Sequence, residues 1–179
     1  MNAAEFIARV SDAVLPARFV PAYGETVSKY LTVGVDAITS PDTNELWLIP
    51  QIKMLFDLAR TNFGAAIPAR AGCRTDAHET KLQAAGYKTA KFVSPHSLGV
   101  ALDLDAIARE VQGKFRNETA VNILIQQAIK DAAETLGFPT PRLGHLAYSE
   151  KFTHVDLVFM LFAPHTALPH PADWPELPA

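Results

Sequence analysis

The chain lacks the residues on which several common function classes depend. Its single cysteine, Cys73, cannot form an internal disulfide. Lys and Arg number 16 against 19 Asp and Glu, a net charge of −3, so we expect no binding surface for nucleic acid or acidic lipid. Glycine-rich phosphate loops and a G-x-S-x-G element are absent, which disfavours nucleotide chemistry and serine hydrolysis.

Long apolar runs are missing as well. Residues 1–20 are interrupted by Glu5, Arg9 and Asp12, so they lack the apolar core of a secretory signal and predict a short amphipathic helix. The longest apolar run, residues 158–163, is too short to span a bilayer. We therefore expect a chain that is made in the cytoplasm without a cleaved leader and does not insert into a membrane.

What is present suits one mixed domain. The length of 179 residues fits a single domain, which we expect to act as a monomer. Apolar spacing and capping residues predict helices over residues 50–63, 76–85 and 117–136. Strands are predicted over 65–69, 100–105 and 152–162. Because these elements do not follow a βαβ rhythm, we expect an α+β fold with a small antiparallel sheet and flanking helices.

The stretch SPHSLGVALDLD, residues 94–105, holds a histidine and two acids. Strand alternation places Asp103 and Asp105 on one face. A catalytic zinc site needs three nitrogen or carboxylate ligands and a fourth position for water. His96, Asp103 and His154 can supply such a set, and Gly99 keeps the backbone between the first two uncrowded. By themselves, a histidine and an aspartate at this spacing also fit ordinary core or surface residues.

Three stretches occur in order: GCRT at 72–75, SPHSLGVALD at 94–103 and FTHVD at 152–156. Together they resemble the zinc D-alanyl-D-alanine carboxypeptidases and related peptidoglycan endopeptidases, which share a fold with the hedgehog signalling domain. The family pattern is G-Y-R-[ST], S-x-H-x-x-G-x-A-x-D and F-x-H-x-D. The match runs from about residue 48 to 159, so the resemblance implies a hedgehog-like fold.

The resemblance also implies roles for individual residues. His96, Asp103 and His154 would be the ligands of Zn²⁺. Arg74 would hold the substrate and stabilise the oxyanion, which suits a planar and permanently charged donor. Ser94 would lie near the substrate, where its hydroxyl could donate to a carbonyl or carboxylate.

The general base departs from the family pattern. Many relatives carry an acid three residues before the last histidine, where this chain has Lys151. Glu150 and Asp156 both share a strand face with His154, because each lies an even number of residues away. Either carboxylate could take a proton from the attacking water, and Asp156 could instead orient a ligand. We favour Glu150 as the base.

Other residues near the motifs, including Cys73 in the GCRT turn, are weaker candidates for a part in the site. His145 is expected to be a loop residue that could contact substrate, whereas His78 and Glu79 are expected to be solvated on the helix over 76–85. Cys73 replaces the aromatic residue common in the family turn, and we expect it to be a buried, unreactive thiol.

The matched part of the chain has a defined extent. Residues 48–162 form the expected peptidase core. Residues 1–45 are an N-terminal extension outside the resemblance, and residues 163–179 form a proline-rich tail.

The resemblance implies a zinc metallopeptidase that cleaves D-amino-acid-containing stem peptides of peptidoglycan. It leaves open whether the cut is at D-Ala-D-Ala, as in a carboxypeptidase, or at L-Ala-D-Glu, as in an endopeptidase. A hydrolase that acts on the cell wall without a leader is typical of a phage-type endolysin released through a membrane lesion. The alternative is a non-catalytic, zinc-containing module that binds wall peptides, which the residues at positions 151 and 73 favour.

Overall fold

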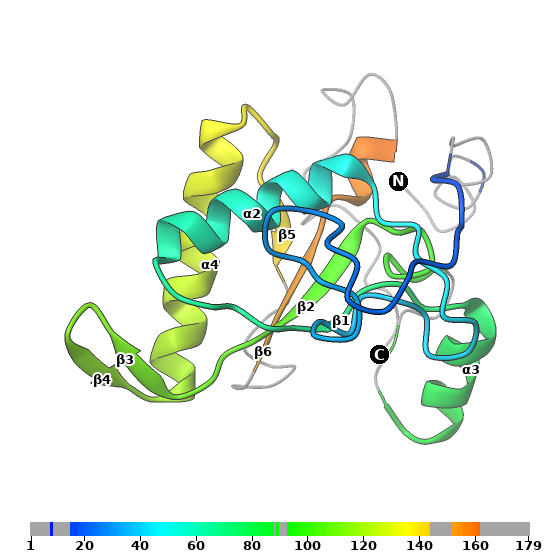
Figure 1. Ribbon diagram of the computed structural model, residues 1–179, viewed down its shortest axis with the longest axis horizontal. Helices are drawn as coiled ribbons and strands as arrows, with labels where there is room; N and C mark the ends of the chain where they lie inside the picture. Colours follow the sequence, from blue (N-terminus) through cyan, green and yellow to red (C-terminus); the bar gives the residue numbers. More distant parts are fainter. Residues whose placement is uncertain (1–7, 9–14, 88, 90–92, 144–151, 162–179) are drawn as a thin grey trace.

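The computed structural model describes residue 8 and residues 15–87, 89, 93–143 and 152–161 (Figure 1). Of residues 1–20, where a short helix is expected, only residue 8 and residues 15–20 are described, and residues 15–20 form no helix. The proline-rich tail lies outside the described residues. Within the described ranges, three α-helices accompany a four-stranded antiparallel sheet and a two-stranded hairpin. The expected α+β fold with a small antiparallel sheet is confirmed. No helix in these ranges is long and apolar enough to cross a membrane.

The sheet has the strand order β1-β2-β6-β5. Its strands are β1 (Ala69–Ala71), β2 (Ala101–Asp105), β5 (Arg142–Leu143) and β6 (Phe152–Asp156). The pairing of β2 with β6 sets Asp103 opposite His154 and Ala101 opposite Asp156. Residues separated by about fifty positions in the sequence thus become cross-strand neighbours.

Helices α2 (Pro50–Phe63) and α4 (Glu118–Thr135) pack against each other, and α4 also contacts β6. Figure 1 shows these two helices crossing, with the shorter α3 (Asp76–Ala84) at the far side of the molecule. Both predicted long helices are confirmed. The side-chain carbonyl oxygen of Asn117 caps the start of α4 by accepting a hydrogen bond from the Ala120 N–H. At the end of α2, Gly64 adopts a left-handed φ of 75°.

Two predicted strands differ from the observed ones. The run over 65–69 becomes a strand only from Ala69, because Pro68 has no N–H to give to a ladder. The run over 152–162 leaves the sheet after Asp156 and continues as the 3₁₀ helix η1 (Val158–Leu161). The Asp156 carboxylate accepts from the Val158 N–H at 3.3 Å, which turns the chain at that point.

A hairpin, β3 (Arg109–Val111) and β4 (Lys114–Arg116), was not predicted. Its turn places Gln112 and Gly113 at φ values of 53° and 72°. A two-residue turn of this kind matches the twist of the flanking strands. The sequence signals this turn only weakly, through the pair Gln112-Gly113. Glycine is common in such turns, but glutamine is not favoured at the position before it.

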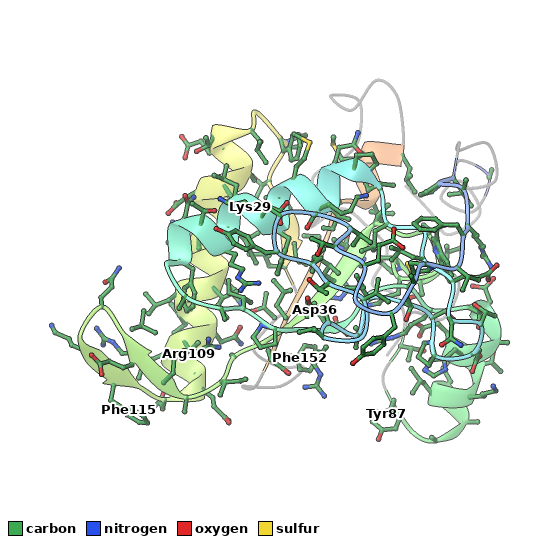
Figure 2. The ribbon with its side chains drawn as sticks, in the orientation of Figure 1. Lys29, Asp36, Tyr87, Arg109, Phe115 and Phe152 are labelled. Carbon is green, nitrogen blue, oxygen red and sulfur yellow. The ribbon has the colours of Figure 1, made fainter. Side chains whose placement is uncertain are left out.

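Residues 31–49 enter the same apolar core as the helices and the sheet. Leu31, Ile38 and Leu46 from this segment are buried with residues of α2, β2 and α4. Asp36 (Figure 2) is buried and accepts hydrogen bonds from the N–H groups of Thr32 and Ala69. This carboxylate therefore joins the segment to the start of β1.

Candidate metal centre

His96, Asp103 and His154 lie together, and one ligand atom from each falls within 4.8 Å of the others. Asp103 Oδ1 is 2.9 Å from His154 Nδ1 and 3.3 Å from His96 Nε2. His96 comes from the turn before β2, Asp103 from β2 and His154 from β6. This group could hold a metal ion, as expected from the sequence.

The turn that carries His96 depends on Gly99. Gly99 has a φ of +71°, and an added Cβ would lie 2.0 Å from the carbonyl oxygen of Trp47. The Trp47 indole N–H also donates to the Ser97 carbonyl at 3.0 Å. The glycine is thus required by its dihedral angle and by close backbone approach, whereas the sequence interpretation attributed it to space near the metal.

Hydrogen bonds on the far ring nitrogens orient both histidines. His96 Nδ1 lies 2.6 Å from the carbonyl oxygen of Gly72, which can only accept, so Nδ1 carries the proton and Nε2 faces Asp103. His154 Nε2 lies 3.1 Å from Asp156 Oδ2, which leaves Nδ1 facing Asp103. This is how metal-ligating histidines are held in proteins.

Asp156 is fully buried, and both of its oxygens are occupied. Arg142 Nε donates to Oδ2 at 2.8 Å, His154 contacts the same oxygen, and Oδ1 accepts the Val158 N–H. Burial raises the pKa of Asp156, but the charge of Arg142 and the contact with His154 outweigh it and leave the pKa below its ordinary value. These contacts suit a carboxylate that orients His154.

The electrostatics of the group favour a cation between the three side chains. Burial raises the pKa of Asp103, but His96 and His154 outweigh it and bring that pKa well below its ordinary value. Burial lowers the pKa of His154, yet its bonds to Asp103 and Asp156 raise it to about 9. The positive charge that the Asp103 carboxylate attracts can come from a proton on His154 or from a metal ion.

The donor set also fits the dimensions of a zinc site. Two tetrahedral ligands at about 2.1 Å from zinc stand roughly 3.4 Å apart. The separations of 2.9 and 3.3 Å from Asp103 Oδ1 are close to that value, and all three ligand atoms lie within 4.8 Å of one another. Two imidazole nitrogens and one carboxylate oxygen are a common ligand set for catalytic zinc.

Arg74 and Ser94 adjoin this group directly, and Glu79, whose part here the sequence interpretation missed, links the two. Arg74 Nη2 donates to Asp103 Oδ2 at 2.7 Å, and Nη1 lies 3.5 Å from Glu79 Oε1. Ser94 donates to the same Glu79 oxygen at 3.0 Å. The prediction that Glu79 is solvated was wrong, because its exposed fraction is 5%. His78 is half-buried beside Asp42.

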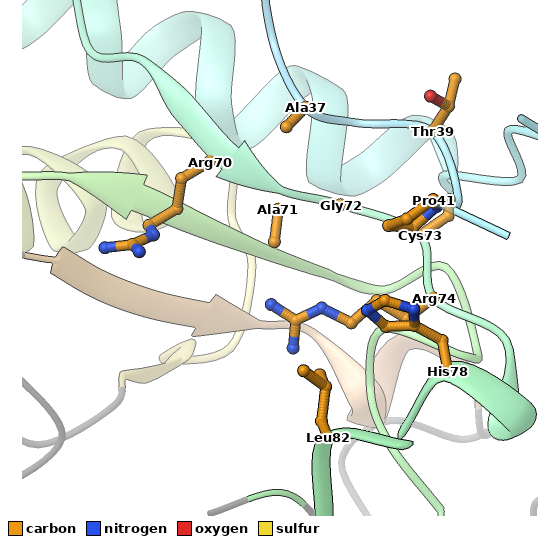
Figure 3. A pocket seen from close by; sticks show the side chains of 10 residues that line it. All are labelled: Ala37, Thr39, Pro41, Arg70, Ala71, Gly72, Cys73, Arg74, His78 and Leu82. Atoms are coloured by element: carbon orange, nitrogen blue, oxygen red, sulfur yellow. The ribbon is translucent and has the colours of Figure 1, made fainter. Parts of the chain in front are cut away.

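A cavity of about 180 Å³ lies beside Arg74 (Figure 3). Arg70, Arg74 and His78 supply its basic groups, and Cys73 and Leu82 are among its other lining residues. Figure 3 shows both arginine side chains on the same side of β1. Two arginines, whose guanidinium groups are permanently charged, therefore line the cavity, and one of them, Arg74, contacts Asp103.

Other candidates from the sequence have different positions. Glu150 and His145 lie outside the described residues. Cys73 is buried, and its sulfur accepts from the Trp47 N–H at 3.2 Å. Burial raises the pKa of the Cys73 thiol to about 12, which is consistent with an unreactive thiol.

No protein-family model matches the chain, and no curated protein matches it. Among solved structures, the chain is similar to the crystal structure of the L-Ala D-Glu endopeptidase ChiX from Serratia marcescens. The identity is 21%, the TM-score is 0.48, and the match covers 63% of this chain and 82% of that chain. A likeness of this extent assigns neither a family nor a function.

Proposed function

We propose that the chain is a zinc-dependent peptidase that cleaves stem peptides of peptidoglycan. The observation that carries the proposal is the arrangement of His96, Asp103 and His154, in which each histidine turns one ring nitrogen toward the Asp103 carboxylate while its other ring nitrogen is held by Gly72 or Asp156. A set of three ligands that includes an acid is typical of catalytic zinc, whereas structural zinc has four closed ligands. The substrate class comes from the resemblance of the three motifs.

In this proposal, zinc supplies a Lewis acid that makes water nucleophilic near neutral pH. His96, Asp103 and His154 would hold the ion, and Asp156 would keep His154 in the tautomer that binds it. Arg74 donates to the carbonyl oxygen as negative charge develops there, a role that suits a guanidinium already fixed by Asp103. Ser94 is the proposed second contact to the peptide.

Glu150 is the proposed general base. Asp156, the other candidate, accepts from Arg142 and Val158 and contacts His154, which favours the orienting role for that residue. Glu150→Gln is expected to retain zinc and lose most of kcat, because only the proton acceptor is removed. Retained turnover with zinc bound would assign the base elsewhere.

The cavity beside Arg74 supports an anionic substrate. Arg70 and Arg74 line it, and carboxylates are natural partners of guanidinium groups. Stem peptides carry free carboxyl groups, so we propose that this cavity receives one of them. The position of the cleaved bond, D-Ala-D-Ala or L-Ala-D-Glu, follows from the fragments released.

The test is digestion of purified peptidoglycan by the zinc-loaded protein, followed by mass spectrometry of the released peptides. Fragments are expected with the wild type and with His170→Ala, which alters a histidine outside all three motifs. His96→Ala, checked for folding by circular dichroism, is expected to release none. If several wall types yield no fragments while zinc stays bound, the non-catalytic binding module becomes the better description.

A further inference from the structure

Glu79 is a buried acid that neither the motifs nor the proposed ligand set uses. It lies on α3, and its exposed fraction is only 5%. Burying an ionised carboxylate is unfavourable unless its charge is paired. Its other oxygen, Oε2, has no hydrogen-bond partner among the described residues, so burial here is only partly compensated. Such incomplete pairing is unusual in a residue that serves stability alone.

The partners of Glu79 are the two residues proposed to contact the peptide. Oε1 accepts the Ser94 hydroxyl at 3.0 Å and lies 3.5 Å from Arg74 Nη1. The other arm of Arg74 donates to Asp103 Oδ2 at 2.7 Å. The guanidinium is therefore held at two points, by a carboxylate from α3 and by a proposed metal ligand.

The bond to Glu79 also fixes the direction of the Ser94 hydroxyl. A hydroxyl has one proton and two lone pairs, and an ionised carboxylate can only accept. The proton of Ser94 therefore points to Glu79, while its oxygen accepts the His96 N–H at 3.3 Å. As long as this bond lasts, Ser94 can offer a lone pair to a substrate N–H but cannot donate to a carbonyl. This differs from the donor role expected from the sequence.

We propose that Glu79 is a positioning residue that fixes Arg74 as the donor and Ser94 as the acceptor at the peptide. Arg74 would then meet a carbonyl oxygen, and Ser94 an amide N–H, which together recognise a peptide backbone. The inference rests on the proposed peptidase function and deepens it, because it assigns hydrogen-bond directions to the two substrate contacts.

The test uses Glu79→Gln, which keeps the size of the side chain and removes its charge. We expect full zinc content, a melting temperature equal to or above that of the wild type, and a fall in kcat/KM of roughly 10- to 100-fold, the effect of one or two charge-assisted hydrogen bonds. Most of the fall should be in kcat, since Arg74 acts as charge develops. Glu134→Gln, which alters an exposed acid on α4, is the matched control and should behave as the wild type.

A second measurement does not depend on turnover. In ¹⁵N-labelled protein, the guanidinium signals of Arg74, assigned with Arg74→Lys, should be resolved in the wild type and broadened in Glu79→Gln, because one of two anchors is lost. Unchanged kcat/KM together with unchanged Arg74 signals would overturn the proposal. Activity lost in proportion to zinc would also overturn it, since Glu79 would then serve only to keep the site intact.

The two proposals can fail separately. If the wild type cleaves no peptide, the peptidase function fails, and the Arg74 signals alone decide whether Glu79 positions the guanidinium. If the wild type cleaves peptide and Glu79→Gln cleaves it equally well, the function stands and the role of Glu79 fails. Glu79→Ala adds a check on folding. A melting temperature below that of Glu79→Gln measures how much the packing of the side chain, rather than its charge, contributes to stability.

Discussion

Asp156 and Asp103 are both buried acids on the face of the sheet that bears His154, yet their partners give them different tasks. Asp103 faces both histidines, whereas Asp156 stands behind His154 and is paired with Arg142. Asp156→Asn should therefore weaken zinc binding about 10- to 100-fold, as loss of a group that orients a ligand does. Competition against a chromophoric chelator measures this, with Asp131→Asn on α4 as an exposed control. Unchanged zinc affinity with abolished kcat would instead make Asp156 the base.

Arg70 tests whether the cavity beside Arg74 selects anionic peptides. Its side chain is 48% exposed and pairs with Asp105 at 3.3 Å, a partly solvated pair that contributes little to stability. Arg70→Gln should leave the melting temperature within about 2 °C and raise KM several-fold for stem peptides with free carboxyl groups. The same peptides with carboxamides should show similar KM values in both proteins. An equal change for both peptide series would place the carboxylate contact elsewhere.

At the scale of elements, the turn between His96 and β2 is the local structure on which the site depends most. Gly99→Ala would strain a left-handed residue and press its Cβ onto the Trp47 carbonyl. We expect a loss of about 2–5 kcal/mol in the free energy of unfolding, combining backbone strain and overpacking, together with loss of zinc binding. Gly86→Ala is the matched control, because Gly86 has a similar φ of +85° but no atom within 4 Å of the added Cβ.

Denaturant unfolding and zinc titration compare the two glycine variants directly. Gly86→Ala should lose only about 1–2 kcal/mol, the cost of a left-handed non-glycine residue, and should bind zinc normally. Equal losses in the two variants would mean that the contact with Trp47 is relieved without cost. Normal zinc binding by Gly99→Ala would show that the turn is not what places His96.

The elements differ in how far the sequence predicts them. The helix α4 follows from local signals, the cap at Asn117 and the apolar stripe of residues such as Val121 and Ile125. The end of β6 does not, because residues 157–161 remain apolar while the chain leaves the sheet. The turn at that point is made by the Asp156 carboxylate and the Val158 N–H, and such side-chain bonds are not visible in a hydrophobic pattern.

At the scale of the whole molecule, the motifs indicate the candidate ligands and, beside them, Arg74, Ser94 and Asp156, but they do not indicate Glu79. The motifs give His96, Asp103 and His154 because residue types and spacing encode a ligand set. Glu79 was missed because α3 has a weakly amphipathic, polar sequence, which predicts a solvated helix. Its burial arises only when Arg74 and Ser94, from other parts of the chain, meet it in the fold.

Zinc should also stabilise the whole molecule, because its proposed ligands join the turn before β2, β2 itself and β6. A ligand present at about 100 times its Kd adds about 2.7 kcal/mol to the free energy of unfolding. For a chain of 179 residues, this corresponds to a rise in melting temperature of about 5–10 °C. Chelator-treated protein should regain this rise with Zn²⁺ but not with Mg²⁺, which prefers oxygen ligands over imidazole.

Because His96→Ala lacks one ligand, it should show little or no rise. A rise of equal size in that variant would place the bound zinc outside the proposed centre, and no rise in the wild type would remove the metal from the mechanism.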